Sequence, residues 1–258
     1  GNYLWFVYPF RGSNMITKNE VKYIQSLAHQ KKRNEERVFL AEGIKLVEDL
    51  VKYCPDNINT VYATENYAPQ LQQLIADRPV HIITEDELAR ISQMQSPNQV
   101  LAVVRQFDFA EPLQDADEWL LVLDGIQDPG NMGTIIRLAD WFGIKNILSS
   151  PDCVDVYNSK VVQASMGSIA RVGVHCLDVC SWLKGYRHSI VGAQMRGTPL
   201  NAFSFPKAGI LVIGSEGKGI RHEMSALLTD SITIPSFGQA ESLNAGTATG
   251  IILWELRK

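Results

Sequence analysis

Two residues with the types and spacing of a reactive site, Asn131 and Arg137, lie six positions apart in the segment 124–137 (DGIQDPGNMGTIIR). Asp128 and Pro129, just before them, are typical of a helix start. Free backbone N–H groups at a helix start favour anions, so an asparagine and an arginine there suit a phosphate or an RNA backbone. A capping asparagine beside a solvent-facing arginine is the common alternative, and the segment alone does not decide between them.

A second segment, residues 214–219 (GSEGKG), follows an apolar run and contains Glu216. Glycines at such a turn let a ligand approach the backbone closely. Its spacing is neither that of a P-loop nor that of a dinucleotide fingerprint. Residues 222–226 (HEMSA) lack the second histidine of a zinc protease helix, which excludes zinc proteolysis. Taken alone, the segment is most typical of an ordinary strand-to-helix turn.

The third segment places Ser242 and Asn244 at the head of a helix predicted to begin near Leu243, beside Ile234 and Pro235. The helix is rich in alanine and glycine over 245–250, and its glycines lower helix stability. Such small residues suit a helix against which something packs closely. That neighbour is another helix, a second subunit or a cofactor.

Strands and helices alternate around these three segments, which predicts an α/β domain with a mostly parallel sheet. The run 119–123 contains almost no polar residue, as expected for a strand that helices cover on both faces. Strands are expected at 119–123, 146–148, 172–177, 190–194, 210–214 and 232–234, and helices from Asp128 to Gly143 and over 160–170, 222–228 and 243–258.

The part before residue 119 predicts a smaller α/β unit and a linker. Residues 1–14 are expected to be an extension that is not native, with Met15 as the natural start. Residues 15–106 form the small unit, 107–118 an acidic linker without Lys or Arg, and 119–258 the larger domain. In the small unit, a helical stretch is expected from Met15 to Glu36, strands at 37–40, 59–62, 81–84 and 100–104, and helices at 41–52, 70–76 and 85–91.

Composition limits the classes of function. A net charge of −4 argues against a protein that coats nucleic acid by bulk electrostatics. A local basic face is still compatible with it, and Lys31, Lys32, Arg33 and Arg37 are predicted to contact RNA, with a solvated helix face as the alternative. No apolar run reaches the length of a membrane span. The four cysteines match no disulfide or metal pattern, so we expect reduced thiols, no metal and a cytoplasmic protein.

Together and in this order, the three segments resemble the motifs of the SpoU (TrmH-like) branch of the SPOUT RNA ribose methyltransferases. The resemblance covers about residues 119–258, and residues 164–168 (ASMGS) are similar to a small-residue segment that the family carries between its first two motifs. Residues 37–106 resemble the L30e-like RNA-binding domain that often precedes the family's catalytic domain.

The resemblance implies a homodimer that transfers methyl from S-adenosylmethionine to a ribose 2′-hydroxyl of structured RNA. It also implies a C-terminal trefoil knot, an exception to unknotted topology. By carry-over, Arg137 is the catalytic arginine, Asn131 and Glu216 shape the site, and Ser242 and Asn244 complete it. Backbone groups of the cofactor site would be those of Gly214, Ile234 and Leu243.

An arginine is a poor base, because deprotonating it at pH 7 costs roughly 7 kcal/mol. We therefore expect Arg137 to grip an RNA phosphate and orient the hydroxyl, with the proton lost to that phosphate or to water. Two departures from the family pattern are Gly246, where a serine is usual, and Gln163, where an arginine is frequent. We expect activity to survive both.

Ribosomal RNA is the expected substrate, on family analogy, and transfer RNA is the alternative. An RNA-binding or ribosome-assembly factor that has lost turnover is a competing interpretation, which the retention of Arg137, Glu216 and Asn244 disfavours. A generic nucleotide-binding α/β protein would require a glycine fingerprint that this sequence lacks.

Overall fold

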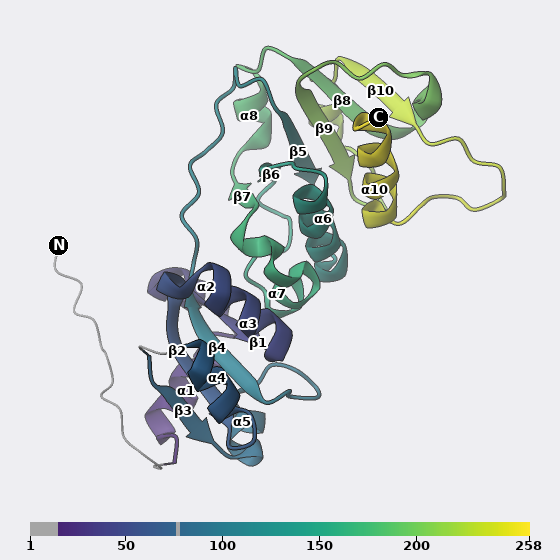
Figure 1. Ribbon diagram of the computed structural model, residues 1–258. Helices are drawn as coiled ribbons and strands as arrows, with labels where there is room; N and C mark the ends of the chain where they lie inside the picture. The colour runs from purple at the N-terminus through teal and green to yellow at the C-terminus, as the bar shows by residue number, and fades with distance from the viewer. Residues whose placement is uncertain (1–14, 76–77) are drawn as a thin grey trace. The chain divides into compact units, whose positions relative to one another are not determined.

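The computed structural model describes residues 15–75 and 78–258, which divide into two compact units: one up to Gln106 and one from Phe107 onward (Figure 1). The predicted extension, residues 1–14, lies outside the described residues. Within the described ranges, no helix is both long enough and apolar enough to cross a membrane.

The first unit is a four-stranded sheet with helices. The sheet order is β1-β4-β2-β3, antiparallel except between β2 and β3. Its elements are α1 (Lys18–Ser26), α2 (Gln30–Glu36), β1 (Val38–Glu42), α3 (Ile44–Tyr53), a 3₁₀ turn (Pro55–Asn57), β2 (Ile58–Thr64), α4 (Ala68–Leu74), β3 (Val80–Ile83), α5 (Glu85–Ile91) and β4 (Val100–Arg105).

Two differences from the sequence prediction in this unit have local causes. The helical stretch 15–36 is two helices, and the Arg33 Nη1 group donates to the carbonyls of Leu27 and Ala28 at the end of α1. The helix predicted from residue 41 begins only at Ile44, because Gly43 has φ +92°. That backbone conformation favours glycine and separates β1 from α3.

The second unit has a six-stranded sheet of order β10-β8-β9-β5-β6-β7, and every strand pair in it is parallel. Its elements are β5 (Trp119–Asp124), α6 (Pro129–Trp141), β6 (Asn146–Ser149), α7 (Ser159–Ser165), a 3₁₀ helix (Met166–Ala170), β7 (Gly173–Cys176), α8 (Val179–Leu183), β8 (Ser189–Pro199), a 3₁₀ turn (Leu200–Ala202), β9 (Gly209–Gly214), α9 (His222–Ser225), β10 (Asp230–Thr233) and α10 (Ala245–Leu256).

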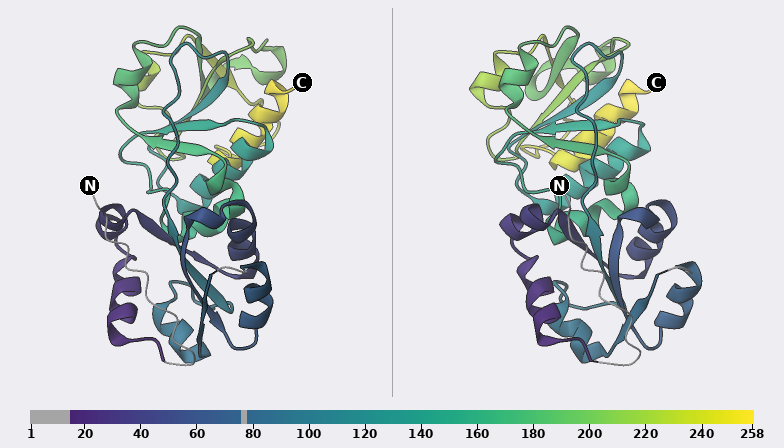
Figure 2. Two further views of the ribbon diagram at one scale, coloured as in Figure 1. Left: turned by 60° about the vertical axis from the view of Figure 1, so that its left-hand side comes forward. Right: turned by 90° about the vertical axis from the view of Figure 1, so that its left-hand side faces the viewer.

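Both faces of this sheet are covered, which explains the continuous apolar run of β5. Alternate residues of β5 pack on opposite sides: Leu121 with the side chains of α6 and α10, and Val122 with those of α8 and α9. In both views of Figure 2 the yellow C-terminal helix α10 lies beside α6. The predicted α/β class, with a mostly parallel sheet and a smaller N-terminal domain, is confirmed.

Several element bounds in the second unit differ from prediction. The helix expected over 160–170 ends at Ser165 and continues as a 3₁₀ helix, α9 is only four residues long, and α10 begins at Ala245 with Asn244 as its N-cap. The short helix α8 was not predicted. The trefoil knot stays a prediction.

Candidate active site

Asn131 is held at the start of α6. The Asp128 side chain is the N-cap of this helix, and its Oδ1 accepts the Asn131 backbone N–H at 2.7 Å. Pro129 occupies the first turn, where its missing N–H leaves no bond unmade. Only 8 % of Asn131 is exposed, so its amide group has one defined orientation.

The three segments identified from the sequence meet at this asparagine. The Asn131 Nδ2 donates to Glu216 Oε1 at 2.8 Å, and the Asn131 Oδ1 accepts from Asn244 Nδ2 at 2.7 Å. The backbone N–H of Ala245, the first residue of α10, also donates to Glu216 Oε1, at 3.1 Å. We call Asn131, Glu216 and Asn244 the site network.

The site network leaves hydrogen-bonding capacity for a ligand. Glu216 is exposed and uses only Oε1; its Oε2 makes no hydrogen bond with residues 15–75 or 78–258. The Asn244 Oδ1 caps α10 by accepting the Thr247 N–H at 3.1 Å. A carboxylate oxygen beside a helix N-terminus can accept a hydroxyl hydrogen bond, which is what orienting a ribose 2′-hydroxyl requires.

Glu216 is presented by a closed loop that follows β9. The Gly219 N–H donates to the Ser215 carbonyl at 2.8 Å, and the Lys218 N–H donates to Ser215 Oγ at 3.3 Å. A Cβ on Gly214 would overlap the backbone of Gly219, so only glycine fits there. The loop is therefore compact and places Glu216 at its tip.

Arg137 and Ser242 are not in the site network. Arg137 lies about 9 Å further along α6 by helical rise, on another face of the helix. It is exposed, and Ser242 is exposed too; neither makes a hydrogen bond or ion pair with another residue in the described part of the chain. The structure thus brings together three of the five predicted catalytic residues.

The segment between β10 and α10 fits a cofactor bound through backbone groups. Among the described residues, the only hydrogen bond made within 235–243 is that of Ser236 Oγ to the Gly238 carbonyl. Ile234 packs against the core, and Leu243 is 45 % exposed, so apolar surface lies at both ends of a segment with available N–H and C=O groups. The third residue predicted to contact the cofactor, Gly214, lies at the end of β9.

The departure at Gly246 has a packing explanation. A Cβ at this position would lie 3.0 Å from Thr134 Cγ2 and 3.2 Å from Asn244 Oδ1. Glycine therefore lets the start of α10 approach α6 closely, in keeping with the small residues noted in this helix.

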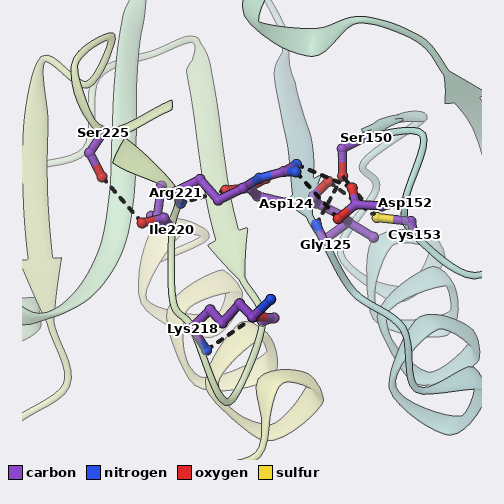
Figure 3. Close-up of polar contacts among 11 residues, drawn as sticks. Asp124, Gly125, Ser150, Asp152, Cys153, Lys218, Ile220, Arg221 and Ser225 are labelled. Atoms are coloured by element: carbon purple, nitrogen blue, oxygen red, sulfur yellow. Dashed lines mark hydrogen bonds and ion pairs between the residues drawn. The ribbon is translucent and has the colours of Figure 1, made fainter. Parts of the chain in front are cut away.

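Arg221 and two aspartates form a second cluster, which the sequence analysis missed (Figure 3). The Arg221 Nε donates to Asp124 Oδ1 at 2.7 Å, and its Nη1 and Nη2 donate to the Asp152 carboxylate at 3.3 and 3.2 Å. We call these three residues the Arg221 cluster. The available signal was Asp124, a charged residue that ends an otherwise apolar run.

The predicted RNA contacts in the first unit require one correction. Arg33 is 4 % exposed and bonds to backbone carbonyls, so it serves the fold and is not offered to RNA. Lys31 and Lys32 lie within ion-pair distance of Glu35 and Glu36, at 4.0 and 2.6 Å, and Arg37 is exposed in a left-handed conformation after α2. In the part of the chain that the structure describes, no group of three or more His, Cys, Asp or Glu residues could hold a metal ion.

Family models identify both parts of the chain. Residues 118–254 match the SpoU rRNA Methylase family, and residues 18–102 match an MRM3-like substrate binding domain. The chain belongs to the SpoU family and is an S-adenosylmethionine-dependent RNA 2′-O-ribose methyltransferase.

Individual relatives agree over nearly the whole length. The 23S rRNA guanosine 2′-O-methyltransferase RlmP of Bacillus subtilis is 29 % identical over 93 % of this chain and 97 % of its own. A TrmH-family protein from Porphyromonas gingivalis is 35 % identical, with a TM-score of 0.82 over 95 % of this chain and 99 % of its own. An AdoMet-bound rRNA methyltransferase from Sinorhizobium meliloti is 30 % identical, with a TM-score of 0.81 over 95 % and 96 %.

Proposed function

We propose that this enzyme methylates a ribose 2′-hydroxyl of 23S ribosomal RNA, in the cytoplasm, as a homodimer without a metal ion. The observation that carries the site assignment is the site network, in which Asn131, Glu216 and Asn244 converge from three separate segments. The choice of RNA is supported by relatives such as RlmP, which match this chain in both units.

Methyl transfer requires the residues of this chain to perform only a few chemical tasks. S-adenosylmethionine supplies an electrophilic methyl group. The protein must therefore orient the 2′-oxygen toward that methyl group and allow the hydroxyl proton to leave. In this proposal Glu216 Oε2 accepts a hydrogen bond from the hydroxyl. The hydrogen bond from Asn131 Nδ2 to Glu216 Oε1 supports this role, because it fixes the carboxylate. Arg137 grips a phosphate of the RNA with its planar guanidinium, and that phosphate or water takes the proton of the hydroxyl.

A homodimer explains why Arg137 stands apart from the site network. The outer face of α6 and α10 is apolar: Trp141 is 83 %, Trp254 61 % and Ile251 40 % exposed. Arg137 lies one turn from Trp141 on the same side of α6. Two chains that bury this face would bring Arg137 to the subunit boundary, where it can complete a site that spans both chains.

The proposed knot is supported by the path of the C-terminal segment. β10 lies at the sheet edge, four strands along from β6, yet α10 returns to pack on α6 above the middle of the sheet. The segment 234–244 makes that return, and it carries the proposed cofactor contacts Ile234 and Leu243.

The test is transfer of labelled methyl from S-adenosylmethionine to total RNA from cells that lack this enzyme, with counts sorted by RNA size class. We expect label in 23S rRNA, and loss of about 100-fold or more with Arg137→Ala. Arg137→Lys should also fail, because lysine lacks the planar fork that binds phosphate in two places.

Label in transfer RNA alone would overturn the ribosomal assignment. Cofactor binding without transfer to any RNA would favour the lapsed-enzyme interpretation. For the dimer, Trp254→Lys should convert the protein to monomers in sedimentation velocity and remove activity, while a wild-type monomer would contradict the proposal.

A further inference from the structure

Arg221 joins the carboxyl ends of three neighbouring strands. It follows the loop after β9, and it reaches Asp124 at the end of β5 and Asp152 just after β6 (Figure 3). These strands are adjacent in the order β9-β5-β6. Ligands of parallel α/β sheets bind at this edge, so a residue that crosses it bears directly on the geometry of the site.

The inner contact of Arg221 is with a fully buried carboxylate. The Asp124 side chain has no exposed surface, and both of its oxygens bond to Arg221: Oδ1 to the guanidinium and Oδ2 to the backbone N–H at 2.7 Å. A buried carboxylate is tolerated only when it is paired. Asp124 therefore fixes both the side chain and the backbone of Arg221, at the point where the Glu216 loop ends.

The outer contact is with a half-exposed carboxylate that is itself held in place. Ser150 Oγ donates to Asp152 Oδ1 at 2.7 Å and accepts the Gly125 N–H at 2.9 Å. The Ser150 hydroxyl and then the Arg221 charge hold the pKa of Asp152 below its ordinary value. Asp152 thus remains an anion at neutral pH and binds the far end of the guanidinium.

All three guanidinium nitrogens of Arg221 contact one of two carboxylates, unlike those of Arg137, which make no such contact in the described part of the chain. These contacts hold the Arg221 side chain against the sheet. The Glu216 loop has one end at β9, and its other end is fastened by Arg221 to Asp124.

We propose that Arg221 is a positioning residue for methyl transfer, which fixes the loop 214–220 so that Glu216 reaches Asn131 and the start of α10. This rests on the proposed function in one respect, the assignment of Glu216 to the site. Arg221 acts on the reaction through Glu216.

The first test is Arg221→Lys, which keeps a cation beside Asp124 and preserves the backbone N–H bond but loses the planar fork. We expect kcat to fall about 10- to 100-fold, as for a catalytic group displaced by about 1 Å, with the KM for RNA unchanged. Amides of 214–220 should exchange hydrogen faster than in wild type. Arg171→Lys is the matched control, because Arg171 pairs with Asp140 at 2.8 Å in the same unit but outside the loop.

The second test is a double-mutant cycle with Glu216→Ala. If Arg221 acts through Glu216, then Arg221→Lys should have no further effect on kcat in the Glu216→Ala background. Additive losses would overturn the proposal, as would unchanged loop exchange. A raised KM for RNA at unchanged kcat would show instead that Arg221 binds RNA.

The two proposals fail in distinguishable ways. If the wild-type protein transfers no methyl to any RNA, the proposed function fails, while hydrogen exchange in the loop of wild type and Arg221→Lys still decides whether Arg221 fixes it. If methyl transfer proceeds and Arg221→Lys leaves both kcat and loop exchange at wild-type values, only the positioning role fails.

Discussion

The site network and the Arg221 cluster both lie at the carboxyl ends of the strands of one sheet, but they consist of different chemical groups. The site network joins two amide side chains to one exposed carboxylate, with Glu216 Oε2 left over. The Arg221 cluster joins one guanidinium to two carboxylates, of which Asp124 is fully buried.

The difference indicates two roles: the site network orients the substrate, and the Arg221 cluster holds the protein backbone in place. Amides have fixed donor and acceptor ends, so a chain from Asn244 through Asn131 to Glu216 sets the direction of each bond. These bonds leave Glu216 Oε2 available to a ligand. A buried ion pair is costly to break, because breaking it leaves an uncompensated charge, and it is suited to holding backbone in place.

The largest effect expected from this comparison is on stability. Arg221→Ala leaves the Asp124 carboxylate buried and unpaired, so the free energy of unfolding should fall by about 3–5 kcal/mol. Urea denaturation measures it. Arg221→Ala combined with Asp124→Asn should recover much of the loss, and a loss of less than 1 kcal/mol in the single variant would show that the pair is not structurally important.

The next effect concerns activity. Glu216→Ala removes the acceptor of two hydrogen bonds in the site network, so kcat should fall about 100-fold, equivalent to about 2.7 kcal/mol of transition-state stabilisation. Stability should change much less than with Arg221→Ala, because Glu216 is exposed. Steady-state kinetics and a melting curve together test this. A Glu216→Ala variant that is strongly destabilised but keeps the wild-type kcat would reverse the comparison.

A smaller effect is expected at Asn244, which belongs to the site network and also caps α10. Asn244→Ala should lower the free energy of unfolding by about 1 kcal/mol through loss of the cap. Asn244→Ser restores the cap, but the serine cannot reach Asn131 in the same way. It should therefore recover the stability that Asn244→Ala loses, while kcat stays below the wild-type value. Equal recovery of both would show that capping is the only role of this residue.

The smallest expected effect is the pH dependence of stability that comes from the contact between Arg221 and Asp152. The pKa of Asp152 is lowered in the folded state by the Ser150 hydroxyl and by Arg221, so its contribution is present above the ordinary aspartate pKa of about 3.9 and is lost as pH falls through the folded value. Because Asp152 is 45 % exposed, the contribution should be below about 1 kcal/mol. Urea denaturation between about pH 5 and pH 2 should show a shallower acid slope for Asp152→Asn than for wild type.

Much of the fold could be predicted from local sequence. The apolar run 119–123, the Asp128–Pro129 helix start and the strand at 210–214 all lie where expected, because their signals are local. Boundaries were wrong where one backbone conformation or one tertiary contact decides: Gly43 delays α3, and α7 ends at Ser165 before a 3₁₀ helix.

The basic stretch in the first unit shows the same limit for function. Lysine and arginine look alike in a charge count, yet Arg33 is buried among backbone carbonyls while Lys31 is exposed. Burial depends on where α2 packs, which residue type does not reveal.

By itself, the sequence determined the alternation of strands and helices, the family of the protein and the identity of three residues that meet in the site. These follow from composition, periodicity and ordered motifs along the chain. Only the tertiary structure decided that Asn131, Glu216 and Asn244 share hydrogen bonds, that Arg137 stands apart from them and that Arg221 lies between two aspartates. The physical reason is distance along the chain: Asp124 and Arg221 are 97 residues apart, and only the packing of parallel strands brings their side chains within 2.7 Å.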